Sequence, residues 1–198
     1  IFDNAHEAVA DLLNAPSQDE IVFGQNMTTL TLHVSRSIGR CFKRGDEIIL
    51  SRMDHDANVA PWLLVARDLG LQVNWLPFNS DTFEFDLDQL DSILTDRTRL
   101  VCVAGASNFT GTINDIKTIS EKAHDAGAWT YIDAVQSVPH VSTDVQHLGC
   151  DFLVCSAYKF FGPHIGALWG RRALLEMLEP YKVRPAPEKI PGCFETGT

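Results

Sequence analysis

The chain carries the stretch Ser156-Ala-Tyr-Lys159-Phe-Phe-Gly162-Pro163, directly after the apolar run Phe152-Leu-Val-Cys. An earlier apolar run, Trp129-Thr-Tyr-Ile, ends in Asp133. Both runs have the length and composition of buried strands. Since parallel sheets bind their ligands at the carboxyl ends of strands, we expect the lysine and the acid to lie at that edge of a sheet.

Short β-rich runs alternate with longer helical patterns along the chain. We expect strands over residues 20–23, 47–51, 72–77, 99–105, 129–133, 151–156 and 167–170, and helices over 27–41, 57–69, 87–94, 115–126 and 171–178. This alternation predicts an α/β fold, with a mostly parallel seven-stranded sheet covered by helices on both faces. From Pro180 onward the pattern gives way to a proline-rich segment, which predicts a long loop.

A lysine paired with a strand-end acid is what pyridoxal 5′-phosphate (PLP) chemistry requires. The lysine forms a Schiff base, and a carboxylate opposite the pyridinium nitrogen keeps that nitrogen protonated. We therefore interpret Lys159 as the Schiff-base lysine and Asp133 as the acid that stabilises a carbanion at the substrate. We also expect the apolar strand before Lys159 to shield its amine from water and make it nucleophilic. Taken alone, Lys159 would be a solvated surface charge and Asp133 a helix cap.

These motifs, in this order, resemble the class V aminotransferase and cysteine desulfurase family of fold-type I PLP enzymes. The resemblance extends from about residue 21 to residue 198. It implies that residues 1–198 are the PLP-binding large domain, a fragment of a longer chain with an N-terminal segment and a C-terminal small domain outside it. It further implies a PLP-dependent enzyme that acts on an amino acid and is closest to the cysteine desulfurases.

The resemblance assigns roles to three further polar residues. His55, in Asp-His55-Asp-Ala-Asn-Val-Ala-Pro-Trp62, would stack on the cofactor ring and take part in proton transfer, which suits a histidine near neutral pH. Asn108, in Ala-Ser-Asn108-Phe-Thr-Gly111, and Gln136, three residues after the strand-end acid, would hydrogen-bond near the 3′-oxygen of PLP. Without the resemblance these would be ordinary turn and surface residues.

The cofactor phosphate needs an anion site, and Gly24-Gln-Asn26-Met27-Thr28-Thr29 lies between a short strand and a long helical pattern. The first turn of a helix offers unpaired N–H groups and a favourable dipole to an anion. The resemblance makes Thr28 a phosphate ligand, with the backbone amides of Asn26 and Met27 beside it and Ser156 as another ligand. Relatives commonly carry Gly-Thr-Thr here, so Asn-Met-Thr is a departure.

A second departure is Tyr158, where cysteine desulfurases usually have a phosphate-binding histidine. The Tyr158 hydroxyl could replace that contact. His164 follows the same glycine–proline turn and could either line the pocket or lie outside it, and no chemical role is assigned to it. The last residues, Phe194-Glu-Thr-Gly-Thr198, resemble a family segment that reaches across a homodimer, which would place Thr198 at the partner subunit's PLP phosphate and make the active sites shared.

The composition excludes several other classes of protein. A net charge of −10 and a pI near 5.0 argue against binding nucleic acid, which needs a basic face. The sequence contains no run of about eighteen apolar residues, so we predict no membrane span. No signal peptide is visible in it. The five cysteines have no metal-ligand spacing, so we expect no metal site and a reducing, cytoplasmic location.

Several alternatives stay open, and two are excluded. The nucleophilic cysteine of a desulfurase and a carboxylate-binding arginine would lie outside this chain, so desulfuration, transamination and epimerisation remain possible reactions, as does a non-catalytic protein of the same fold. A dinucleotide-binding domain would need G-x-G-x-x-G after the first strand, which is missing. The S-x-x-K of Ser156 to Lys159 also fits penicillin-binding proteins, but their S-D-N and K-T-G motifs are absent.

Overall fold

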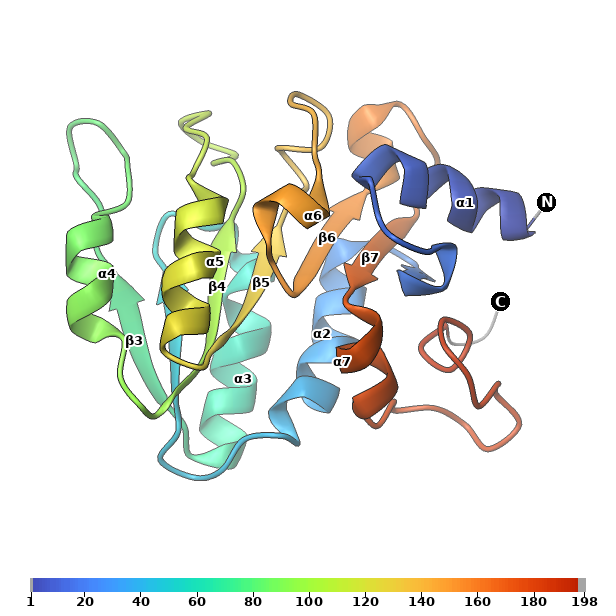
Figure 1. The fold of residues 1–198 in the computed structure, drawn as a ribbon, viewed down its shortest axis with the longest axis horizontal. Coiled ribbons are helices and arrows are strands. Elements are labelled where there is room, and N and C mark those ends of the chain that lie inside the picture. Colours follow the sequence, from blue (N-terminus) through green and yellow to red (C-terminus); the bar gives the residue numbers. More distant parts are fainter. Residues whose placement is uncertain (1, 196–198) are drawn as a thin grey trace.

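A computed structural model describes residues 2–195, and its centre is one seven-stranded sheet (Figure 1). The strand order is β1-β7-β6-β5-β4-β2-β3. Strands β2 to β6 are parallel where they pair, and β7 is antiparallel to both of its neighbours. The expected mostly parallel, seven-stranded α/β fold is therefore confirmed. The bounds of the strands are β1 Ile21–Gly24, β2 Glu47–Ser51, β3 Gln72–Leu76, β4 Thr98–Ala104, β5 Trp129–Asp133, β6 Phe152–Ser156 and β7 Gly166–Gly170.

Helices cover both faces of this sheet. In Figure 1, α4, α5 and α6 lie in front of the strands, and α2 and α3 lie behind them. No helix in the described part of the chain is long and apolar enough to cross a membrane. The α-helices are α1 Phe2–Leu13, α2 Met27–Gly39, α3 Ala60–Leu69, α4 Leu87–Ile93, α5 Ile116–Asp125, α6 Val145–Leu148 and α7 Arg172–Met177, and short 3-10 turns span Gln18–Glu20 (η1), Asp56–Asn58 (η2) and Ala157–Phe160 (η3).

The sheet has a separate apolar layer on each face because side chains alternate along a strand. In β2, Ile48 and Leu50 pack into the cluster that includes Val34 of α2, whereas Ile49 packs with Ile119 of α5. All five of these side chains are fully buried. This burial on both faces explains why the strands have continuous apolar sequences rather than alternating ones.

The structure differs from the sequence-based expectation in three helical segments. Helix α1 was not expected, and neither was the four-residue α6. The single helix expected over 57–69 is instead η2 followed by α3, because Pro61 occupies the first turn of a helix that starts at Ala60. The other bounds agree with expectation or differ from it by one or two residues, as helix and strand ends commonly do.

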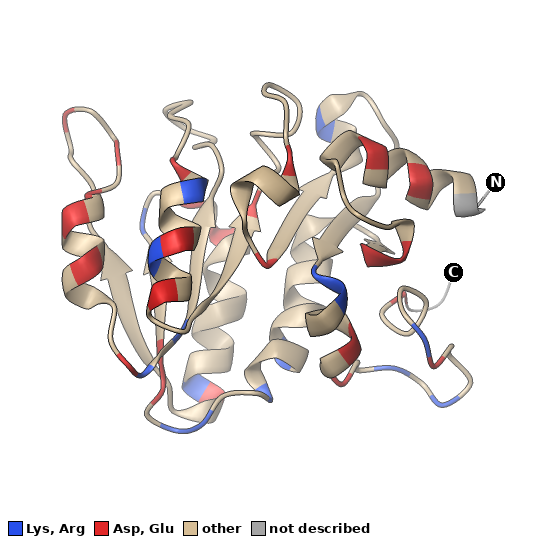
Figure 2. Cartoon of the chain, in the orientation of Figure 1, with Lys and Arg blue, Asp and Glu red and all other residues tan. Residues whose placement is uncertain are grey.

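Charged side chains lie mainly on the helices and connecting loops. Figure 2 shows acidic residues on α1, α4 and α5, with lysines and arginines distributed among several segments. The described part of the chain contains no group of three or more His, Cys, Asp or Glu side chains that could hold a metal ion.

Candidate active site

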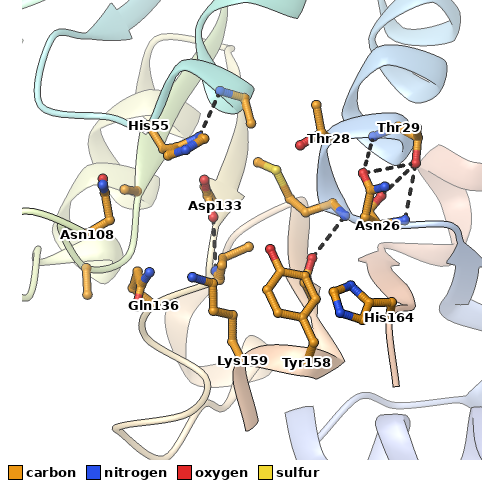
Figure 3. Close-up of a pocket in the computed structure, with 16 residues that line it drawn as sticks. Asn26, Thr28, Thr29, His55, Asn108, Asp133, Gln136, Tyr158, Lys159 and His164 are labelled. Atoms are coloured by element: carbon orange, nitrogen blue, oxygen red, sulfur yellow. Dashed lines mark hydrogen bonds between the residues drawn. The ribbon is translucent and has the colours of Figure 1, made fainter. Parts of the chain in front are cut away.

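A cavity of about 500 Å³ opens at the carboxyl ends of the central strands, beside the N-terminus of α2. Its volume is in the range of small-molecule sites. Figure 3 shows polar side chains from several separate segments directed toward this space. Ten of the expected site residues line it: Asn26, Met27, Thr28, His55, Asn108, Asp133, Gln136, Ser156, Tyr158 and Lys159. Thr198 lies outside the described residues.

Asp133 lines the cavity from the last position of β5. The residue is buried, and its Oδ1 accepts a hydrogen bond of 2.9 Å from the N–H of Val135. Burial raises the pKa of this carboxyl to about 6, against the opposing effects of the Val135 hydrogen bond and of His55 and Lys159. The carboxyl thus lies in a poorly solvated position that favours a cationic partner.

Lys159 lies in η3, immediately after β6. The turn closes tightly, because Phe161 takes a left-handed conformation with φ of 65° and the N–H of Gly162 donates to the carbonyl of Ala157 at 2.9 Å. A Cβ on residue 162 would lie 2.9 Å from the Cβ of Ala157, so only glycine fits there. The turn carries Lys159 out of the apolar strand to an exposed position on the cavity wall. The expectation that apolar neighbours shield its amine is therefore wrong.

The first turn of α2 forms the opposite wall of the cavity. The side chain of Asn26 caps the helix by accepting from the N–H of Thr29 at 2.9 Å, and the N–H of Asn26 donates to Thr29 Oγ1 at 3.2 Å. The N–H of Met27 donates to Ser156 Oγ at 3.0 Å. These two amides therefore have protein partners already. Thr28 is exposed, and its hydroxyl makes no hydrogen bond to another described residue, so it remains able to bind an anion.

His55 is the N-cap of η2, where its Nδ1 accepts from the N–H of Ala57 at 3.1 Å. A ring nitrogen that accepts this hydrogen bond leaves the proton on Nε2 in the neutral form. The ring lies on the same side of the cavity as Asn108 in Figure 3. This arrangement fixes the orientation of the imidazole at the cavity wall.

Two residues near the site were missed or left without a role. His164 lines the cavity and stacks on Tyr158, with ring centroids 4.7 Å apart and planes inclined by 17°. Asp54 lies between β2 and η2 and does not line the cavity; its Oδ2 accepts from Asn58 Nδ2 at 2.7 Å, and its enclosed Oδ1 has no hydrogen-bond partner of normal geometry among the described residues. Burial raises the pKa of the Asp54 carboxyl to about 7, and the nearby charge of Asp133 adds to this effect.

Comparison with known proteins is consistent with this geometry. The family described as "Aminotransferase class-V" matches residues 1–185. The chain belongs to the class-V aminotransferase family. This membership confirms the resemblance carried by the motifs, and the match begins earlier in the chain than the motifs suggested.

Several cysteine desulfurases are similar to this chain in sequence or structure. The chain is 42% identical over 183 residues to a cysteine desulfurase of Pectobacterium carotovorum, which covers 91% of this chain and 45% of that protein. It superposes on the cysteine desulfurase CsdA of Escherichia coli with a TM-score of 0.94 and 35% identity, over 100% of this chain and 52% of the other. A cysteine desulfurase of Thermococcus onnurineus gives a TM-score of 0.93 and 30% identity, over 100% and 52%. The chain therefore spans about half the length of these relatives.

Proposed function

We propose that this chain is the PLP-binding large domain of a cysteine desulfurase-like enzyme that acts on an amino acid. One observation carries the proposal: Lys159 and the buried Asp133 line one cavity together with the N-terminus of α2. The similarity to cysteine desulfurases supports it. A lysine, an opposed carboxylate and an anion-binding helix terminus are the three elements that hold PLP in its enzymes.

The residues of the cavity fit this cofactor. Among the described residues, the carboxylate of Asp133 accepts a hydrogen bond at Oδ1 alone, from the N–H of Val135, so its Oδ2 can accept from a protonated ring nitrogen in the cavity. Thr28 also lines the cavity, and its hydroxyl has no partner among residues 2–195 at the positive end of α2, where a phosphate would be stabilised. The cavity volume of about 500 Å³ is sufficient for a small cofactor and a small substrate.

When bound, PLP supplies an aldehyde that bonds to amines and a ring that accepts electrons from the α-carbon of the substrate. Lys159 Nζ would hold the cofactor and would remove and return the proton at that α-carbon. Asp133 would keep a proton on the ring nitrogen, because its burial strengthens an ion pair with a cation. His55 would lie against the ring, and Asn108 and Gln136 would orient its polar groups. Thr28 and Ser156 would bind the phosphate.

The cysteines of this chain support the view that the sulfur-accepting nucleophile lies elsewhere. A thiolate is the reactive form of cysteine, and a raised pKa suppresses it. Burial raises the pKa of all five thiols, to about 12 for Cys150 and Cys155. None of them lines the cavity. If desulfuration is the reaction, the nucleophilic cysteine and the substrate-binding arginine belong to residues outside this chain. Transamination and epimerisation are the alternative reactions.

The proposal includes the assembly and the location of the protein. A homodimer would let Thr198 of each subunit reach the phosphate in the other, as the resemblance of its segment implies. A reducing, cytoplasmic location is consistent with five free cysteines among the described residues. Sedimentation of the full-length protein tests the dimer. Loss of PLP affinity in Thr198→Val, about ten- to a hundred-fold for a lost charge-assisted hydrogen bond, tests the shared site.

The direct experiment records the visible absorption spectrum of the full-length protein with PLP, before and after reduction with borohydride. A reducible band, with the pyridoxyl group mapped by mass spectrometry to Lys159, is expected. Lys159→Ala should lack both the band and the adduct while remaining folded, since the residue lies on an exposed turn. An adduct on another lysine would overturn the assignment. Release of sulfide from L-cysteine would then separate a desulfurase from the alternatives, and absence of any turnover would indicate a non-catalytic protein.

A further inference from the structure

Tyr158 and His164 form a stacked pair of rings at the edge of the cavity. Their centroids are 4.7 Å apart, and both rings line the space that Lys159 enters. The Lys159 Nζ lies 5.5 Å from the centre of the Tyr158 ring. In Figure 3, Tyr158 lies between Lys159 and His164, and His164 lies on the side of the cavity where Asn26 begins α2. The imidazole is therefore at the end of the cavity that is suited to an anion.

The backbone fixes His164 in this place. The carbonyl of Ile165 accepts from the N–H of Ala157 at 2.9 Å, and Gly166 pairs with Ser156 in the sheet. A Cβ on Gly166 would lie 2.4 Å from the carbonyl carbon of Asn26, so β7 touches the backbone of the α2 cap. His164 is two residues before this contact. Its position beside the helix terminus thus follows from the antiparallel return of β7 and not from a mobile loop.

The cavity has few positive side chains that could balance the charge of a phosphate. Among the described residues that line it, Lys159 is the only lysine and there is no arginine. In the proposed function Lys159 bonds to the aldehyde, so it does not serve as a counter-ion for the phosphate. The helix terminus supplies only about half a unit of charge. Histidine can supply a further positive charge near neutral pH, and an aromatic face beneath it stabilises a cation.

We propose that His164 is a cofactor-binding residue that donates a hydrogen bond to the phosphate of PLP, and that Tyr158 positions it through the stacked ring. The inference rests on the proposed function. It differs from the view that the Tyr158 hydroxyl itself binds the phosphate, and the two views predict different effects for removal of the ring and removal of the hydroxyl.

The test compares dissociation constants of PLP and of pyridoxal, which lacks the phosphate, for full-length protein by absorption titration. His164→Ala should weaken PLP binding at least about tenfold, as expected for a hydrogen bond to a charged group, and leave pyridoxal binding unchanged. His140→Ala, an exposed histidine outside the cavity, is the matched control and should affect neither ligand. Tyr158→Ala should reproduce the selective loss, whereas Tyr158→Phe, which keeps the ring, should lose much less.

Each other result overturns a stated part of the inference. If His164→Ala weakens the binding of PLP and of pyridoxal equally, or weakens neither, His164 does not bind the phosphate. If Tyr158→Phe weakens PLP binding selectively, and as much as His164→Ala does, the Tyr158 hydroxyl makes the contact with the phosphate. Unchanged PLP affinity in Tyr158→Ala would remove its positioning role. If the parent protein binds PLP no better than pyridoxal and forms no reducible adduct, the proposed function itself fails, which is a distinct outcome.

Discussion

The hydroxyl of Ser156 accepts a hydrogen bond of 3.0 Å from the backbone N–H of Met27. This contact joins the last residue of β6 to the first residue of α2, which are far apart in the sequence. Both groups are buried. Because Lys159 follows Ser156 by one turn, the bond helps to set the distance between the lysine and the N-terminus of α2. It therefore has a structural role that does not depend on a bound phosphate.

Ser156→Ala is expected to lower the free energy of unfolding of the cofactor-free protein by about 1–3 kcal/mol, because it leaves the buried Met27 amide without a partner. Ser37→Ala is the matched control. Ser37 is a buried serine of α2 whose hydroxyl has no hydrogen-bond partner in the described part of the chain, so its removal should cost little. Urea denaturation of the full-length variants measures both. Equal effects of the two substitutions would contradict a structural role for the Ser156–Met27 bond.

Asp54, a partly buried residue whose Oδ1 is enclosed, should make stability depend on pH. Its pKa is about 7 in the folded chain and near 4 when unfolded, so between these values the folded state holds a proton that the unfolded state has lost. The free energy of unfolding should therefore fall as pH rises from about 4 to about 7, with Asp133, whose pKa is about 6, contributing in the same direction.

In Asp54→Asn, the decrease in the free energy of unfolding between about pH 4 and pH 7 should be smaller, by an amount on the order of a few kcal/mol, because an amide does not ionise. The substitution keeps an acceptor for Asn58. Asp56→Asn, at an exposed acid in the adjacent turn, is the control and should leave the pH dependence unchanged. Thermal unfolding at several pH values from 4 to 8 measures the difference. Parallel pH curves for Asp54→Asn and the parent protein would show that Asp54 ionises normally.

Much of the fold and site could be predicted because the strands are buried on both faces. Their apolar runs indicated the sheet, and the runs that end in Asp133 and Ser156 indicated the edge where Asp133 and Lys159 meet. Helix α6 has four residues, which is too short for a periodic pattern. The stacking of His164 on Tyr158 depends on the antiparallel pairing of β7 with β6, and the hydrogen bond between Asp54 and Asn58 depends on the η2 turn. Local sequence does not reveal either contact.

Asp133→Asn is expected to retain PLP but to slow exchange of the α-proton of a bound amino acid by at least about a hundredfold, a typical contribution of a positioned proton-transfer group. The neutral amide keeps the size of the side chain and can still accept from the N–H of Val135, but it cannot hold a proton on the ring nitrogen by charge. Exchange in deuterated buffer, followed by nuclear magnetic resonance, measures the rate. A rate close to that of the parent would remove Asp133 from the mechanism.

Gly166 should be coupled energetically to Ser156, its partner in the register of β6 and β7. A methyl group on residue 166 would lie 2.4–2.8 Å from backbone atoms of Asn26, so Gly166→Ala must push the start of α2 away from the sheet. That movement would lengthen or break the bond from the Met27 N–H to Ser156 Oγ.

A double-mutant cycle tests this coupling. In the Gly166→Ala background, Ser156→Ala should cost less stability than in the parent protein, because the hydrogen bond that it removes is already weakened. For residues that share a contact, the expected interaction energy is about 0.5–3 kcal/mol. Ser37→Ala, combined with Gly166→Ala, provides the reference for additive effects, since Ser37 makes no bond that the shift would break. Additive effects of Ser156→Ala and Gly166→Ala would mean that the start of α2 accommodates the methyl group without losing its attachment to β6.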